Sequence, residues 1–203
     1  MLQTIISGIT AYISTSIDYI IILMIIFSKA KTKKDHVSIY FGDLLGTTVL
    51  VSGALTMAFV LNFVPQEWLL GFLGLIPIYM GIKLLIQGEK DTDEIVSSSL
   101  KKYNLLISTS FITIATCGAD NLGIYTPLFV SQNAQQVIIT LVVFFIMLNV
   151  FFFSGWLFSS IPAVDKILER YGTWISAIVY ILLGLFIMIE SGTIQYVFHA
   201  VVF

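Results

Sequence analysis

Charge is scarce in this sequence. Of its 203 residues only 11% are charged, whereas 58% are hydrophobic, and the mean hydropathy is +0.97. Soluble domains carry about 25% charged residues, so this composition excludes an ordinary soluble domain. Windows with almost no charge recur along the whole chain, which is typical of a helical protein that crosses a membrane several times.

Cysteine is almost absent as well. The single cysteine, Cys117, excludes an intrachain disulfide and a zinc-finger framework. A membrane thiol–disulfide carrier passes a disulfide between paired cysteines, so this class is excluded within a monomer. No P-loop pattern occurs, so this chain does not supply ATP hydrolysis. The first residues lack a basic n-region, and the apolar run after them is longer than a signal-peptide core. We therefore expect a retained transmembrane helix.

Six apolar segments are about as long as a hydrocarbon core of roughly 30 Å requires. They cover residues 3–27, 38–63, 67–87, 104–130, 137–159 and 172–190. A polar linker, 88–102, divides a single transmembrane domain into two three-helix halves, 1–88 and 103–203. The sequence therefore predicts an all-α membrane protein with six transmembrane helices.

All ten Lys and Arg residues fall on one side of the predicted spans. They are Lys29, Lys31, Lys33, Lys34, Lys83, Lys90, Lys101, Lys102, Lys166 and Arg170. Loops rich in Lys and Arg stay in the cytoplasm. We therefore expect a cytoplasmic linker and two extracytoplasmic termini.

Because each half has an odd number of helices, the second half enters the membrane from the opposite side. Its topology is therefore inverted relative to the first half. Weak internal similarity supports this arrangement: Thr15–Asp18 aligns with Thr116–Asp120 with one insertion, and Gly81–Gly88 aligns with Gly184–Gly192. Inverted repeats are typical of secondary transporters whose substrate site lies near the bilayer midplane, between the repeats. We predict two inverted three-helix repeats.

Two carboxylates and the thiol lie inside predicted spans. Asp18 is in the first span, and Cys117 and Asp120, three residues apart, share a face of the fourth. Ionisable side chains in hydrocarbon are costly, and they usually face a partner, an ion path or a water-filled cavity. No basic residue lies inside a span away from its end, so we interpret the three as metal ligands. The alternatives are a structural hydrogen bond for the aspartates and apolar packing for Cys117.

Further polar residues are candidates for the same path. Thr15, Thr116 and Asn121 offer neutral oxygens for an ion, or hydrogen bonds to its ligands. Asp43 lies near the cytoplasmic end of the second span. We interpret it as a solvated interface residue, with a carboxylate that receives incoming ions as the alternative. Glu190 ends the last span on the outer side and is a further candidate for the path.

Glycine and proline surround the predicted site. Gly118, Gly123 and Pro127 favour local unwinding of the fourth span, which would free carbonyl groups to contact a cation. Gly74, Pro77 and Gly81, in the third span, are expected to serve close helix packing or a kink rather than ion contact.

The predicted ligands favour a soft divalent cation. Thiolate selects soft metals, whereas Mg²⁺ and Ca²⁺ prefer sites made of oxygen alone. One thiolate with two carboxylates suits Cd²⁺ well and Zn²⁺ acceptably. Metal binding displaces protons from such groups. We therefore predict export of Cd²⁺, with Zn²⁺ as a second candidate, by metal/proton antiport. The expected partners are the metal ion, as substrate, and membrane lipid. No cofactor and no nucleic acid are expected, and the oligomeric state is left open.

Four stretches resemble the CadD-type cadmium resistance transporters of Gram-positive bacteria, a branch of the lysine exporter superfamily. They are Cys117–Asn121, Phe59–Pro65, Leu70–Tyr79 and Gly184–Ile194, and the resemblance extends over essentially the whole chain. It implies a six-helix efflux protein of the bacterial plasma membrane, not an enzyme, that confers cadmium resistance and takes zinc as a weaker substrate. It does not identify the ligands.

Two other functions compete with this interpretation. An amino-acid exporter of the same superfamily would need a cationic group for its substrate's carboxylate, and no Lys or Arg is placed mid-membrane. Broken-helix N-termini are the alternative way to meet that need. An intramembrane aspartyl protease would use Asp18 and Asp120 as a proton-sharing pair. That reaction gives no role to a thiol three residues away.

Overall fold

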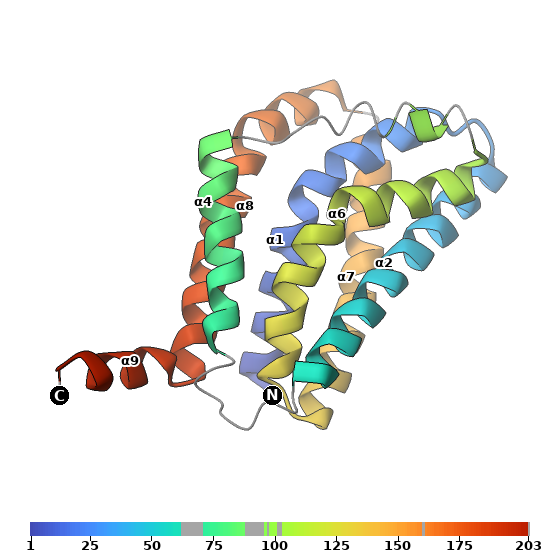
Figure 1. Ribbon diagram of the computed structural model, residues 1–203. Coiled ribbons are helices and arrows are strands. Elements are labelled where there is room, and N and C mark those ends of the chain that lie inside the picture. Colours follow the sequence, from blue (N-terminus) through green and yellow to red (C-terminus); the bar gives the residue numbers. More distant parts are fainter. Residues whose placement is uncertain (62–70, 88–95, 97, 101–102, 160, 203) are drawn as a thin grey trace.

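A computed structural model describes residues 1–61, 71–87, 96, 98–100, 103–159 and 161–202 of this protein (Figure 1). All regular secondary structure within these ranges is helical, which confirms the all-α prediction. The elements are α1 (Leu2–Phe27), α2 (Lys33–Leu61), the 3-10 helix η1 (Gly71–Gly74), α4 (Leu75–Gln87), α6 (Leu105–Val130), α7 (Ala134–Phe158), α8 (Pro162–Glu190) and α9 (Thr193–Val202).

Local signals fix where several helices begin. Asn133 and Gln136 form a reciprocal capping box at the start of α7, which satisfies two backbone N–H groups. At the start of α6 the Asn104 side chain accepts from the Ile107 N–H at 2.9 Å. Gly192 separates α8 from α9 with a φ of +70°, a conformation that glycine adopts without steric cost.

Within the described residues, three helices are long and apolar enough to cross a membrane: α2, α6 and α7. α1 is a fourth if its two parts, Leu2–Ile17 and Tyr19–Phe27, form one span. The two remaining predicted spans have shorter apolar helices, Gly71–Ile86 and Trp174–Ile189. Residues 67–70 of one predicted span lie outside the described residues. α8 carries four charged residues before Trp174, which shortens its apolar part.

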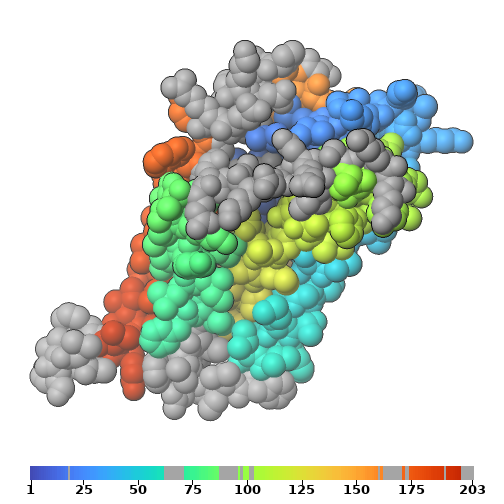
Figure 2. Space-filling view, turned by 45° about the horizontal axis from the view of Figure 1, so that its top comes forward, coloured from blue at the N-terminus to red at the C-terminus, as the bar shows by residue number. Residues whose placement is uncertain are grey.

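Each long helix of the first half of the chain packs against a helix of the second half. α2 runs along α6, α7 along α1, and α4 along α8, while α1 also contacts α6 and α8. Figure 2 shows α4, α6 and α2 following one another across one face of the molecule. α9 extends away from this bundle (Figure 1). α9 is not among the helices predicted from the sequence, because no long apolar run follows residue 190.

Most of the predicted linker, 88–102, lies outside the described residues. Of the part that is described, Val96 and Ser99 are buried. The Ser99 carbonyl accepts a hydrogen bond at 2.8 Å from the Ser108 hydroxyl on α6. This part of the linker therefore packs against the first turn of α6.

Glycines set the distance between α2 and α6. A Cβ atom added to Gly42 would lie 2.6 Å from the Leu106 carbonyl oxygen, and one added to Gly46 would lie 2.6 Å from Thr113 Cβ. Small residues four positions apart allow two helix backbones to approach closely. The second helix of the chain is therefore held directly against α6.

Glycines also allow close approach of α4 to α8. An added Cβ would lie 2.5 Å from the Gly184 carbonyl oxygen at Gly74, and 2.6 Å from the Ala177 carbonyl oxygen at Gly81. The prediction that Gly74 and Gly81 serve close packing is therefore confirmed.

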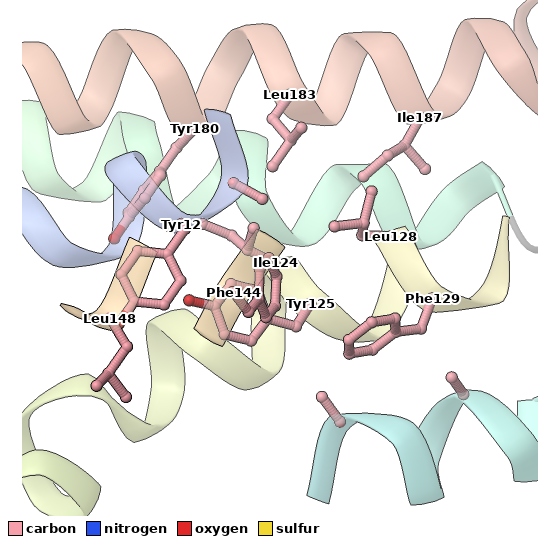
Figure 3. Close-up of a cluster of buried hydrophobic side chains, with 13 residues drawn as sticks. Tyr12, Ile124, Tyr125, Leu128, Phe129, Phe144, Leu148, Tyr180, Leu183 and Ile187 are labelled. Carbon is pink, nitrogen blue, oxygen red and sulfur yellow. The ribbon is translucent and has the colours of Figure 1, made fainter. Parts of the chain in front are cut away.

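The largest buried cluster lies where α1, α2, α6, α7 and α8 meet (Figure 3). Tyr12, Tyr125, Phe144 and Tyr180 are prominent members, and the rings of Tyr125 and Phe144 are 4.4 Å apart between centroids. Aromatic pairs at this distance add to the stabilisation that burial provides.

Large apolar side chains also cover the outer faces of the helices. Phe153 is 55% exposed although its neighbour Phe152 is 5% exposed. Other exposed apolar residues are Val49, Phe59, Ile138, Phe145 and Leu182. Soluble monomers rarely expose so much apolar surface, whereas a membrane protein presents such a surface to lipid. The chain is therefore a membrane protein.

Gly46→Ala tests the contact between α2 and α6. We expect the added methyl group to destabilise the protein by about 1–3 kcal/mol, because it must displace Thr113. The measurement is thermal unfolding in detergent micelles. Gly118→Ala is the matched control, since its added Cβ would meet only Leu50, at 3.8 Å. An unchanged melting temperature for Gly46→Ala would contradict the close approach.

Candidate functional site

Two bent helices, α1 and α6, carry the predicted ligands. The axis of α1 turns by 56° between Leu2–Ile17 and Tyr19–Phe27, and α6 changes direction along its length in Figure 1. In both helices, hydroxyl side chains donate to backbone carbonyls of the preceding turn. In α1 these are Ser14 and Thr15, and in α6 they are Thr109, Ser110, Thr113 and Thr116. Such bonds compete with the helix ladder and bend helices.

The predicted unwinding of α6 is wrong. α6 remains α-helical from Leu105 to Val130, through Gly118, Gly123 and Pro127. A Cβ added to Gly123 would lie 2.7 Å from the Met80 sulfur, so this glycine admits α4 rather than loosening the backbone. Pro127 is three residues from the end of α6, where little of the helix follows it. The helix therefore continues through this segment, and Pro127, which has no N–H, removes only the intrahelical donor of the Gly123 carbonyl.

Cys117 and Asp120 lie on one face of α6, as predicted from their spacing. Cys117 is 6% exposed, and Asp120 is partly buried. The Thr116 hydroxyl lies 3.5 Å from the Cys117 sulfur and 2.7 Å from the Ile112 carbonyl, to which it donates. α6 therefore presents a thiol, a carboxylate and a hydroxyl within about one turn.

The side chains of Asp18 and Glu190 lie outside the described residues. The backbone of Asp18 belongs to α1, at the junction of its two differently directed parts. The described side chains, which exclude these two, contain no group of three His, Cys, Asp or Glu that could hold a metal ion. The convergence of Asp18 on Cys117 and Asp120 therefore stays a prediction.

Asn121 adds an unusual oxygen to this turn of α6. Its side chain is 5% exposed, and among the described residues Oδ1 has no hydrogen-bond partner. Leaving a buried carbonyl oxygen without a donor costs about 1–3 kcal/mol, so such an atom indicates an additional water or ion. Asn121 follows Cys117 by four residues, and the two side chains therefore share a face of α6.

Thr15 ties α1 to α6. Its hydroxyl lies 2.7 Å from the Tyr125 hydroxyl and also approaches the carbonyls of Ala11 and Tyr12, at 3.3 and 3.2 Å. Thr15 and Tyr125 are both buried. The Thr15 oxygen is therefore engaged in holding the two helices together.

The interpretation of Asp43 as a solvated residue is wrong. Asp43 is 2% exposed, and its carboxyl hydrogen-bonds with the hydroxyls of Tyr19 on α1 and Thr113 on α6. The physical reason is the close packing of Gly42 and Gly46 on α6, which carries this turn of α2 into the interior. The glycine spacing around Asp43 was the signal in the sequence that indicated burial.

Comparison with known proteins identifies the family. The sequence matches the model of the family described as cadmium resistance transporter over residues 12–200. The chain belongs to this family. No curated protein matches the chain, and no solved structure does. Membership confirms the resemblance to cadmium resistance transporters and supports a role in cadmium resistance and transport.

Asn121→Leu tests whether its orphaned oxygen faces an ion. We expect the variant to unfold at a higher temperature than wild type without metal, because a buried unsatisfied oxygen is removed. We also expect weaker Cd²⁺ binding. The measurements are thermal unfolding and calorimetric titration of purified protein.

Ser176→Ala is the matched control for this experiment. Ser176 is fully buried on α8, and its Oγ also lacks a partner among the described residues. It should raise stability without changing the affinity for Cd²⁺. Unchanged Cd²⁺ affinity in Asn121→Leu would place that side chain away from the ion.

Proposed function

We propose that this cadmium resistance transporter exports Cd²⁺ from the cytoplasm and binds it through Cys117, Asp120 and Asp18. One observation supports this above all: Cys117, Asp120 and the Asn121 oxygen, which has no hydrogen-bond partner among the described residues, occupy about one turn of α6. Thiolate selects soft metals, and the carboxylates and amide oxygen complete a shell that Cd²⁺ accepts. Zn²⁺ fits the same groups less well and is the second substrate.

Six transmembrane helices in two inverted repeats are the proposed architecture. In this architecture a two-fold axis relates α1 to α6, α2 to α7, and α4 to α8. Such an axis carries the α2–α6 contact onto the α7–α1 contact. It turns the α4–α8 pair into itself. All three pairs pack together, and both α1 and α6 bend. These features support a substrate site between the repeats, near the bilayer midplane.

The two ends of the bundle carry different polar residues, and this difference supports an orientation in the membrane. The connection between α1 and α2 and the first residues of α2 expose Lys29, Lys31, Lys33 and Lys34, which favours the cytoplasm of a bacterial cell for this end. At the other end lies a small polar pocket of about 20 Å³. Its polar lining comes from Gln3, Thr4, Ser7, Ser131, Gln132 and Gln136. The pocket has room for about one water molecule, and its polar lining fits an end of the bundle that meets water.

Export against the membrane potential needs a driving ion. Moving a divalent cation out of a negative-inside cell costs roughly 4.6 kcal/mol per 100 mV. Thiol and carboxyl groups lose protons when they bind metal and regain them when they release it. Protons taken up outside and released inside therefore supply the free energy, and we propose Cd²⁺/H⁺ antiport by alternating access.

Ligand substitutions test the binding site. Cys117→Ser, Asp18→Asn and Asp120→Asn should each weaken Cd²⁺ binding by about tenfold or more, which is about 1.4 kcal/mol. Glu190→Gln is the control and should have a smaller effect. Calorimetric titration of the purified proteins measures each affinity. Unchanged affinity in Cys117→Ser removes the thiol from the site, and a larger effect of Glu190→Gln moves the site outward.

Proton competition gives a second test. Because protons and Cd²⁺ compete for the same groups, the apparent affinity should fall as the pH falls. In proteoliposomes, downhill Cd²⁺ flux should drive protons in the opposite direction, as reported by an internal pH dye. Cd²⁺ flux with no proton movement and no pH dependence would contradict antiport.

A further inference from the structure

α9 projects from the helix bundle at the end opposite the lysine-rich connection between α1 and α2 (Figure 1). It follows α8 after a turn at Gly192, and Figure 1 shows that it leaves the direction of α8. Its ten residues, Thr193–Val202, extend about 15 Å as an α-helix, whereas a hydrocarbon core is roughly 30 Å thick. α9 is therefore too short to cross a membrane.

The start of α9 is held against the bundle. Thr193, its first residue, is fully buried. A Cβ atom added to Gly71 of η1 would collide with the Thr193 hydroxyl oxygen and would lie 2.8 Å from Ser191 Cβ. The φ of +70° at Gly192 turns the chain just before this contact. α9 therefore leaves the bundle in a defined direction.

Apolar and polar residues occupy different sides of α9. Ile194, Val197 and Val201 recur at intervals of three and four residues, so these positions share one side of the helix. Gln195 and His199 occupy positions on the opposite side. Ile194 and Val197 are 41% and 40% exposed, so the bundle leaves them uncovered. The sequence of α9 contains no Asp, Glu, Lys or Arg.

The surroundings of α9 favour lipid as the partner of its apolar side. The apolar segment of α8 ends at Ile189, so α9 begins where the hydrocarbon core gives way to headgroups. Leu182 and Ile189, in the last turns of α8, are exposed on the lipid-facing surface of the bundle, and α9 adjoins this surface. Tyr196 is exposed as well, and tyrosine rings suit the boundary between hydrocarbon and water. An amphipathic helix at this depth buries its apolar side in the bilayer.

We propose that α9 is an interfacial helix that binds the membrane surface, with Ile194 and Val197 in lipid and Gln195 in water. Because α9 has no Lys or Arg, burial of apolar area attaches it, and anionic headgroups are not required. The contact between Thr193 and Gly71 then holds η1, which leads into α4, at the same surface. This inference goes beyond Cd²⁺ transport and does not depend on it.

Spin-label accessibility in phosphatidylcholine nanodiscs tests this placement in the whole chain. Ile194, Gln195 and Val197 are replaced by cysteine one at a time, in a Cys117→Ala background, and labelled with a nitroxide. Collisions with oxygen, which concentrates in hydrocarbon, are compared with collisions with a water-soluble nickel chelate. The oxygen-to-nickel ratio should be high in Ile194→Cys and Val197→Cys and low in Gln195→Cys.

Two further positions calibrate the measurement. Phe153→Cys, on the exposed apolar surface of α7, reports lipid, and Lys31→Cys, in the exposed connection between α1 and α2, reports water. Nickel collisions as frequent in Ile194→Cys as in Lys31→Cys would place α9 in water and overturn the proposal. Exclusion of both reagents from Ile194→Cys and Val197→Cys would indicate a protein contact, such as a second copy of this chain, and would also overturn it.

A matched pair of charge substitutions tests which side of α9 meets lipid. Val197→Glu should lower the oxygen-to-nickel ratio of the label in Ile194→Cys, because a carboxylate on the apolar side draws the helix toward water. Gln195→Glu adds the same charge on the polar side and should leave the ratio unchanged. Equal effects of the two substitutions would contradict the proposed orientation of α9.

Lipid composition tests the cause of the attachment. The ratio in Ile194→Cys should be the same in nanodiscs of phosphatidylcholine and in nanodiscs that also contain phosphatidylglycerol, because α9 has no Lys or Arg to attract anionic lipid. A high ratio that appears only with phosphatidylglycerol would overturn apolar burial as the cause.

Discussion

The cost of placing polar and ionisable groups in an apolar interior shapes this protein throughout. Hydroxyl groups in α1 and α6 donate hydrogen bonds to backbone carbonyls of the preceding turn. Thr15 and Tyr125 satisfy each other across the two helices. The Asn121 oxygen departs from this pattern, as a buried acceptor without a donor among the described residues. A buried atom that destabilises the metal-free protein is expected at a site that binds an ion.

Close packing and bending place these groups together. Gly42 and Gly46 bring α2 against α6, and this contact delivers Asp43 to Tyr19 and Thr113. The hydroxyl bonds that satisfy α1 and α6 also bend them, near the residues expected to bind metal. The buried Asp43 on α2 and the proposed metal ligands on α6 therefore belong to one packed unit.

The sequence predicted helix positions well because windows without charge locate them directly. It also identified Gly74 and Gly81 as packing residues. It failed for Asp43 because apolar length alone does not tell which face of a helix is buried. It failed for the expected unwinding of α6, where Gly123 accommodates Met80 while the helix continues. α9 was missed because the chain after Gly192 has no long apolar run, and the convergence on Asp18 depends on tertiary geometry that spacing does not encode.

X-ray absorption at the cadmium edge tests the central claim most directly. Purified protein loaded with one equivalent of Cd²⁺ should show one sulfur in the first coordination shell, with oxygen atoms completing it. In Cys117→Ser the sulfur contribution should disappear while oxygen ligands remain. An oxygen-only shell around Cd²⁺ in the wild-type protein would contradict the account, because the lone thiol would then play no part in binding the transported ion.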